Sequence, residues 1–268
     1  MIRLAIRVHR RQAELVLAEL LELAPNGVEE LDVSAEVVEY AVYGSPGELP
    51  ELPALRAAAG GAYVDIRSEP VADDWDQRWR RFHRPVTIGG RLTVRPPWEA
   101  PAGTELEVVI DPGRAFGTGA HATTVLCLEL LLDTGPGGSL VDLGCGSGVL
   151  AITAARLGWS PVLALDNDPL AVQATLANCA RNRVRLEARR LDMLAEQVPD
   201  ADLVVANVLS GPLIRWAQAQ RRLADRLILG GMLAAEADSV AVAFAARGLR
   251  ELERRRRGEW AALLMASG

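Results

Sequence analysis

The sequence of 268 residues contains no lysine, and all 29 of its basic residues are arginine. Cysteine is scarce: Cys127, Cys145 and Cys179 are the only three, and no two of them lie at a CxxC spacing. The three histidines are far apart. These absences predict reduced thiols and no bound metal. No apolar run reaches the roughly 20 residues that span a bilayer, and the segment MIRLAIRVHRRQAEL lacks the apolar core of a signal peptide. The composition therefore predicts a cytoplasmic protein without membrane association.

The net charge of −6 is unevenly distributed. Residues 1–67 carry 6 basic and 11 acidic side chains, which gives −5, whereas the remainder carries 23 and 24, which gives −1. Phosphate contacts need clustered cations, so we expect no direct nucleic-acid binding by the N-terminal third. Its acidity suits a basic protein partner. Acidity that merely keeps a small domain soluble explains the same charge equally well.

The first 67 residues read as six short elements. Apolar alternation predicts strands and helical periodicity predicts helices, with Pro25 to Gly27 as a break between elements. In order, the expected elements are a strand at 2–8, a helix at 10–24, strands at 28–33 and 35–43, a helix at 51–59 and a strand at 62–67. This order is that of an α+β ferredoxin-like sandwich.

Residues 68–103 predict a linker made of a helix and a hairpin. The helix, DDWDQRWRRFH, places Trp75, Trp79 and Phe82 on one stripe. Such a stripe either packs against a neighbouring domain or forms a recognition surface. The hairpin signal is VTI-GG-RLTV, in which two β-rich runs flank a two-residue glycine turn.

From residue 104 onward strands and helices alternate, which predicts an α/β Rossmann-like fold with a mostly parallel sheet covered on both faces. A closing hairpin around Gly258 breaks the alternation. The expected strands are 105–110, 139–144, 161–166, 184–191, 202–207 and 230–237, with helices at 121–133, 148–158, 168–182, 211–225 and 239–248.

The strongest chemical signal is the segment VDLGCGSGVLAI. A buried strand ends in Gly144, Gly146 and Gly148, and a helix follows at once, so a ligand can approach the backbone and the free N–H groups of the helix start. The GxGxG spacing, with Asp142 ahead of it, favours S-adenosylmethionine over a dinucleotide, whose usual spacing is GxGxxG. A dinucleotide site remains the alternative.

Acidic residues end the next two strands. Asp166 lies 18 residues after Gly148, where a carboxylate can accept hydrogen bonds from both ribose hydroxyls. The alternative role, capping the following helix, suits Asp168 better. Asp192, after the third strand, is a candidate for contacting the adenine amino group.

Two further segments suggest catalytic roles. In DPGRAFGTGAHATT, the small residues around Phe116, including Gly117 and Thr118, predict a loop that closes over the ligand and excludes water, with a plain domain connector as the alternative. In ANVLSGPL, the amide oxygen of Asn207 could orient an attacking amine, unless Asn207 is a simple turn residue. His121 is the only nearby candidate for a general base.

These segments together resemble the methyltransferases of the PrmA type, which modify the eleventh protein of the large ribosomal subunit. The DPG-x-AFGTG-x-H-x-TT signature, VDLGCGSGVLAI, LALDNDP and VANVLSGPL occur in that family's order, and the resemblance runs over roughly residues 70–268. It implies a class I methyltransferase fold with a seven-stranded sheet. It also implies that Thr124, Gly144, Asp166 and Asn207 contact S-adenosyl-L-methionine.

The resemblance further implies the domain roles: substrate recognition by 1–67, a linker at 68–103 and methyl transfer by 104–268. The expected reaction moves methyl groups to lysine or N-terminal amines of a basic ribosomal protein and releases S-adenosyl-L-homocysteine, with a monomeric enzyme and no metal. Glutamine methylation of release factors is disfavoured, because related enzymes carry NPPY where this chain has NVLS. Methylation of a small molecule or another protein, and an adenosylmethionine-binding module without catalysis, remain alternatives.

Overall fold

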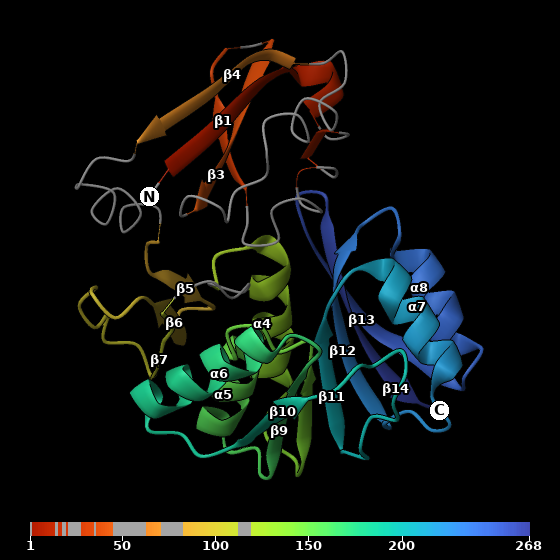
Figure 1. Ribbon diagram of the computed structural model, residues 1–268. Coiled ribbons are helices and arrows are strands. Elements are labelled where there is room, and N and C mark those ends of the chain that lie inside the picture. Colours follow the sequence, from red (N-terminus) through yellow and green to blue (C-terminus); the bar gives the residue numbers. More distant parts are fainter. Residues whose placement is uncertain are drawn as a thin grey trace. The chain divides into compact units, whose positions relative to one another are not determined.

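The computed structural model describes residues 2–13, 16–17, 20, 28–34, 36–44, 63–70, 83–111 and 119–268. The chain forms two compact units, Met1–Phe82 and His83–Gly268, which are coloured from red to blue along the sequence in Figure 1. The expected helix at 51–59 and the aromatic stripe of Trp75, Trp79 and Phe82 lie outside the described residues. In the part of the chain that is described, no helix is long and apolar enough to cross a membrane.

The first unit contains a four-stranded sheet in which every neighbouring pair is antiparallel. The strand order is β2-β3-β1-β4, which is the order of a ferredoxin-like sandwich and agrees with the sequence prediction. A short 3-10 turn, Arg10–Gln12, follows the first strand. The strands are β1 (Ile2–His9), β2 (Glu29–Asp32), β3 (Val37–Gly44) and β4 (Tyr63–Pro70).

The two faces of this sheet differ because side chains alternate along a strand. One face carries the core of the unit: Leu4, Ile6, Val8, Ala13, Val16, Leu20, Val38, Tyr40 and Val42. On the other face Glu39 is buried and accepts hydrogen bonds from Arg3 and Arg7. Burial raises the pKa of Glu39, but these two hydrogen bonds outweigh it and hold the pKa below its ordinary value.

The second unit is built on a seven-stranded sheet of order β10-β9-β8-β11-β12-β14-β13. β14 runs antiparallel to both β12 and β13, and every other neighbouring pair is parallel, which confirms the expected mostly parallel sheet with a closing hairpin. The strands are β8 (Leu140–Leu143), β9 (Val162–Asp166), β10 (Glu187–Arg190), β11 (Leu203–Asn207), β12 (Arg226–Leu233), β13 (Leu249–Arg257) and β14 (Trp260–Ser267).

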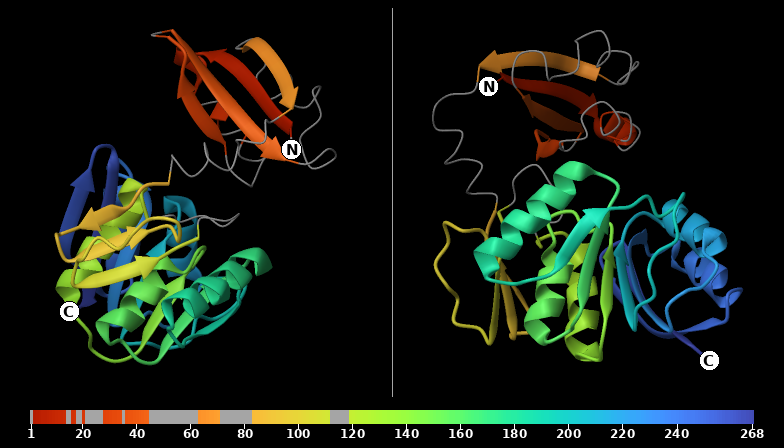
Figure 2. Two further views of the ribbon diagram at one scale, coloured as in Figure 1. Left: turned by 90° about the vertical axis from the view of Figure 1, so that its left-hand side faces the viewer. Right: turned by 60° about the horizontal axis from the view of Figure 1, so that its bottom comes forward.

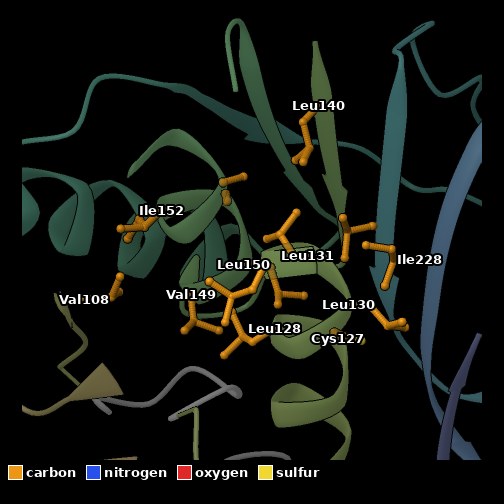
Figure 3. Close-up of a cluster of buried hydrophobic side chains, with 14 of the residues drawn as sticks. Val108, Cys127, Leu128, Leu130, Leu131, Leu140, Val149, Leu150, Ile152 and Ile228 are labelled. Carbon is orange, nitrogen blue, oxygen red and sulfur yellow. The ribbon is translucent and has the colours of Figure 1, made fainter. Parts of the chain in front are cut away.

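Helices cover both faces of this sheet, as Figures 1 and 2 show. One face is covered by α4 (Ala122–Thr134), α5 (Val149–Leu157) and α6 (Pro169–Asn182), and the other by α7 (Ser210–Ala219) and α8 (Ala237–Ala245). Each face has its own apolar core. Figure 3 shows the first core, in which side chains of α4 and α5 pack together and against Leu140 and Ile228 of the sheet.

The strand predicted at 105–110 is confirmed as β7 (Leu106–Val109). It pairs in parallel with β6 (Leu92–Arg95) in a separate sheet with β5 (Val86–Ile88) and does not join the seven-stranded sheet. Two other predictions for this unit were wrong in their bounds. The helix predicted to run to residue 225 ends at Ala219, and the strand predicted at 230–237 is β12, which begins at Arg226 and ends at Leu233. Gln220 is the extended C-cap of this helix, and its buried amide accepts from Val198 N and donates to Glu196 O, contacts that favour the early helix end.

Candidate active site

The glycine-rich turn between β8 and α5, called the cradle below, lies at the carboxyl edge of the sheet. Gly144 and Gly148 have φ of +78° and +81°, a region that favours glycine. A Cβ on Gly144 would lie 2.5 Å from Val208 Cγ1, and one on Gly148 would lie 2.8 Å from Thr175 Cγ2. Both positions therefore exclude a side chain for steric as well as conformational reasons.

Asp166 lies at the end of β9 and holds this turn in place. Its half-buried carboxylate accepts hydrogen bonds from Gly146 N at 2.9 Å and from Asp168 N at 3.0 Å. Asp168 in turn caps α6 by accepting from Leu170 N at 2.8 Å, as predicted. Each Asp166 oxygen keeps further acceptor capacity, because a carboxylate oxygen has two lone-pair sites. The carboxylate can thus bind a donor that enters beside the turn.

Asp142, within β8, is fully buried below the turn. One oxygen accepts from Ala151 N at 2.9 Å, whereas Oδ1 has no hydrogen-bond partner among the described residues. Burial, and to a smaller extent the charge of Asp166, raises the pKa of Asp142 to about 7. The carboxyl therefore titrates close to neutral pH at the base of the cradle.

This raised pKa makes the stability of the chain depend on pH. The folded state binds the Asp142 proton more tightly than the unfolded state, so the stabilisation is complete below about pH 4 and is lost as the pH rises through about 7. From pH 5 to pH 8, we expect the free energy of unfolding of the native chain to fall by about 3 kcal/mol more than that of Asp142→Asn. Urea denaturation at both pH values measures this difference. Parallel pH profiles for the two proteins would contradict it.

Asn207, at the end of β11, faces helix α4. Its Nδ2 donates to Thr124 Oγ1 at 3.1 Å. Its Oδ1 is buried and has no partner within the described part of the chain. A buried amide oxygen without a partner is costly, and such costs are typical of functional sites. Thr124 itself has no exposed surface, so the structure shows it as a support for Asn207, and its contact with a cofactor stays a prediction.

His121 is the N-cap of α4. Its Nδ1 accepts from Thr123 N at 3.4 Å and lies 2.8 Å from Thr123 Oγ1. The ring packs edge-on against Trp260 with the centroids 4.8 Å apart. Burial lowers the pKa of His121, and a neutral ring that accepts at Nδ1 carries its proton on Nε2. The structure therefore shows His121 as a cap, and its role as a general base stays a prediction.

The structure brings together most of the predicted site at one sheet edge. Gly144, Gly146 and Asp166 are joined by hydrogen bonds and loop contacts, and Asn207 is joined to Thr124. Phe116, Gly117 and Thr118 lie outside the described residues. All three cysteines are free and buried, and among the described residues no group of three or more potential metal ligands is close together.

The Gly230–Gly231 pair lies beside Asn207 and was not among the predicted site residues. Gly231 has φ of +83°, and a Cβ there would lie 2.4 Å from the carbonyl oxygen of Val208. The pair lies within a bulge of β12 between Leu229 and Met232. Two adjacent glycines inside an apolar strand were the available signal, because glycine in a strand often marks a bulge or a close backbone approach.

A sheet with this strand order, a glycine turn after β8 and an acid that ends β9 define the class I methyltransferase fold. The family model of "Ribosomal protein L11 methyltransferase (PrmA)" matches residues 54–267. The chain belongs to this family.

Named relatives agree with this membership. The ribosomal protein L11 methyltransferase of Methylococcus capsulatus is 43% identical over 212 residues, which cover 74% of this chain and 71% of that protein. The corresponding protein of Burkholderia multivorans is 36% identical over 272 residues, which cover 90% of each. Across such relatives the chain spans between 63% and 90% of their length. A solved ribosomal protein L11 methylase from Lactobacillus delbrueckii subsp. bulgaricus superposes with a TM-score of 0.62 at 27% identity, over 69% of this chain and 99% of that one.

Proposed function

We propose that the chain transfers methyl groups from S-adenosyl-L-methionine to amino groups of ribosomal protein L11, either lysine or the N-terminal α-amine, and releases S-adenosyl-L-homocysteine. The observation that carries this proposal is the hydrogen bond between the glycine cradle and the Asp166 carboxylate at one sheet edge. The amide oxygen of Asn207, which has no partner among the described residues, lies at the same edge. The names of the relatives support the choice of substrate.

The residues of the cradle fit an adenosylmethionine. Positions 144 and 148 carry no side chain, because a Cβ there would collide with Val208 or Thr175, and the start of α5 offers N–H donors to a carboxylate. Asp166 would hold the ribose hydroxyls with the acceptor capacity that its two backbone contacts leave. When bound, this cofactor supplies an electrophilic methyl group on a sulfonium. No metal is needed for such a displacement.

The protein must supply an uncharged, aligned amine. A lysine amine of ordinary pKa costs about 4.6 kcal/mol to deprotonate at pH 7, whereas an α-amine is already partly neutral. A dry pocket lowers the cost for lysine because burial disfavours the charged form. Asn207 Oδ1 would accept a hydrogen bond from the amine and direct its lone pair. Alignment then contributes most of the acceleration.

The first unit is proposed to recognise the substrate. Residues 1–67 carry a net charge of −5, which complements a basic ribosomal protein. We propose that the enzyme works as a monomer in the cytoplasm, where ribosomal proteins are made, without contacting nucleic acid or membrane directly.

The ribose role of Asp166 leads to a specific expectation. Asp166→Ala should weaken S-adenosylmethionine binding by about 2 kcal/mol, because the ribose hydroxyls lose the carboxylate that accepts their hydrogen bonds. Isothermal titration calorimetry measures the change. Asp168→Ala is the matched control, since it removes the neighbouring carboxylate that caps α6 and should alter stability rather than affinity. An affinity unchanged by Asp166→Ala would refute the role.

Methyl-labelled S-adenosylmethionine, incubated with the chain and with ribosomal proteins freed of RNA, tests the function directly. We expect label in ribosomal protein L11, mapped by mass spectrometry to lysine or the N-terminal amine. Label only in another protein would assign a different substrate. Cofactor binding without transfer to any of these proteins would indicate a small-molecule substrate or a module that binds without catalysis.

A further inference from the structure

Four residues form a square between helix α4 and the sheet. On α4, Thr124 and Cys127 are three positions apart and therefore lie on the same face of the helix. In the sheet, Asn207 of β11 and Gly230 of β12 are direct partners in the parallel register. Thr124 contacts Asn207 through the 3.1 Å hydrogen bond. The remaining corners of the square are Cys127 and Gly230.

Cys127 and Gly230 are in tight contact at these corners. A Cβ on Gly230 would lie 2.4 Å from Cys127 Sγ and 3.1 Å from Asn207 Oδ1. Cys127 has no exposed surface and sits in the packed core shown in Figure 3. The backbone on the other side of Asn207 is equally confined, because Val208 is held against Gly144 and Gly231. Neither partner of the contact can move away without displacing its neighbours.

The chemistry of Cys127 gives no other reason for its place. Burial, with a smaller effect from the charge of Asp142, raises the pKa of its thiol. A neutral, inaccessible thiol is neither a nucleophile nor a ligand. Cys127 supplies a small side chain of defined volume opposite Gly230, which has no side chain.

We propose that Gly230 and Cys127 are a spacer pair that sets how closely α4 approaches the sheet, and that they thereby position the amide of Asn207 for methyl transfer. The hydrogen bond between Thr124 and Asn207 forms only when α4 lies this close to the sheet. A larger pair lifts α4, stretches that bond and turns Oδ1 away from the amine. This inference rests on the function proposed for Asn207 and goes beyond it by naming residues that act without touching substrate or cofactor.

Gly230→Ala is the direct test. We expect kcat to fall about tenfold or more, since small misplacements of a positioning group have large kinetic effects. The Kd for S-adenosylmethionine should change by a smaller factor than kcat, because the cradle around Asp166 is untouched. Gly248→Ala is the matched control: its φ of +87° makes alanine strained, but nothing lies within 4 Å of the added Cβ. This control should lower Tm without changing kcat.

The double variant Gly230→Ala/Cys127→Ala separates positioning from damage to folding, because removing the sulfur makes room for the new methyl. We expect its kcat to return to within about threefold of Cys127→Ala alone. It also provides the readout if Gly230→Ala does not fold. A double variant that folds but stays as slow as Gly230→Ala, or a Gly230→Ala that turns over normally, overturns the proposal.

A cycle with Asn207→Ala distinguishes this inference from the function on which it rests. If Gly230 acts through Asn207, adding Gly230→Ala to Asn207→Ala should lower kcat by less than about twofold further. A full additional loss would show that Gly230 acts elsewhere and contradict the spacer role. Normal kcat in Asn207→Ala alone would instead refute the role proposed for Asn207 and remove the basis of the spacer pair.

Discussion

Asn207→Ala is expected to lower kcat about 100-fold, by at least as large a factor as it weakens S-adenosylmethionine binding, as for loss of a preorganised group that acts mainly in the transition state. The reason is the position of its amide: Nδ2 is committed to Thr124, and Oδ1 is buried with no partner in the described chain. A substrate amine that donates to this oxygen supplies the hydrogen bond whose absence makes burial of the oxygen unfavourable. Single-turnover methylation with calorimetry on the same samples measures both quantities.

Thr124→Val is the graded control for this experiment. The change keeps the shape of the side chain but removes the hydroxyl that accepts from Asn207, so the amide loses its anchor and keeps its oxygen. We expect a loss in kcat of about tenfold, intermediate between the native chain and Asn207→Ala. Normal turnover in Asn207→Ala would count against the proposed site as a whole.

Removal of residues 1–82 is expected to abolish methylation of the ribosomal protein, by at least about 100-fold in kcat/KM, which corresponds to about 2.7 kcal/mol of lost interaction. The cut falls at residue 82 because β4 extends to Pro70 and the second unit begins at His83. That unit keeps its two apolar cores, so the Kd for S-adenosylmethionine should stay within threefold of the full chain.

Cofactor binding also shows whether the truncated protein is folded, which the comparison with the full chain requires. A truncated protein that binds the cofactor and still methylates the ribosomal protein as fast as the full chain would show that the first unit is not the recognition domain. The charge argument adds a second observable: if acidic side chains steer a basic substrate, KM for the full chain should rise with salt.

The sequence predicts the sheet of the second unit well because parallel strands buried on both faces read as short apolar runs. LVDL, VLALD and LVVAN became β8, β9 and β11 with only small changes of boundary. The cap at Asp168 was also correct, since capping depends on a residue and its immediate neighbours. Patterns of this kind depend only on residues that are neighbours along the chain, so the sequence alone reveals them.

The end of α7 and the sheet that β7 joins depend on contacts between residues that are separated along the chain. The segment at 220–225 has good helix formers, but Gln220 is recruited by Val198 and Glu196, more than 20 positions earlier. The strand at 106–109 has the apolar pattern of a sheet strand, yet nothing in that pattern says that it pairs with β6 rather than with β8. Propensity decides neither outcome, because tertiary contacts override it.

The site shows the same division. The glycine turn and Asp166 could be found from spacing along the chain, and the structure joins them by a hydrogen bond. The hydrogen bond between Thr124 and Asn207 joins residues 83 positions apart in the chain. The contact between Cys127 and Gly230 joins residues that are separated by even more positions. These contacts define how the amide is held, and only the folded chain reveals them.

Calorimetric titration of the full chain with S-adenosylmethionine, and in parallel with a nicotinamide dinucleotide, is the most direct test of the methyl-donor site. We predict one S-adenosylmethionine bound per chain, displaced by S-adenosylhomocysteine, and no measurable heat from the dinucleotide. Uptake of the dinucleotide in preference to S-adenosylmethionine, or no uptake of either by a folded chain, would contradict the account.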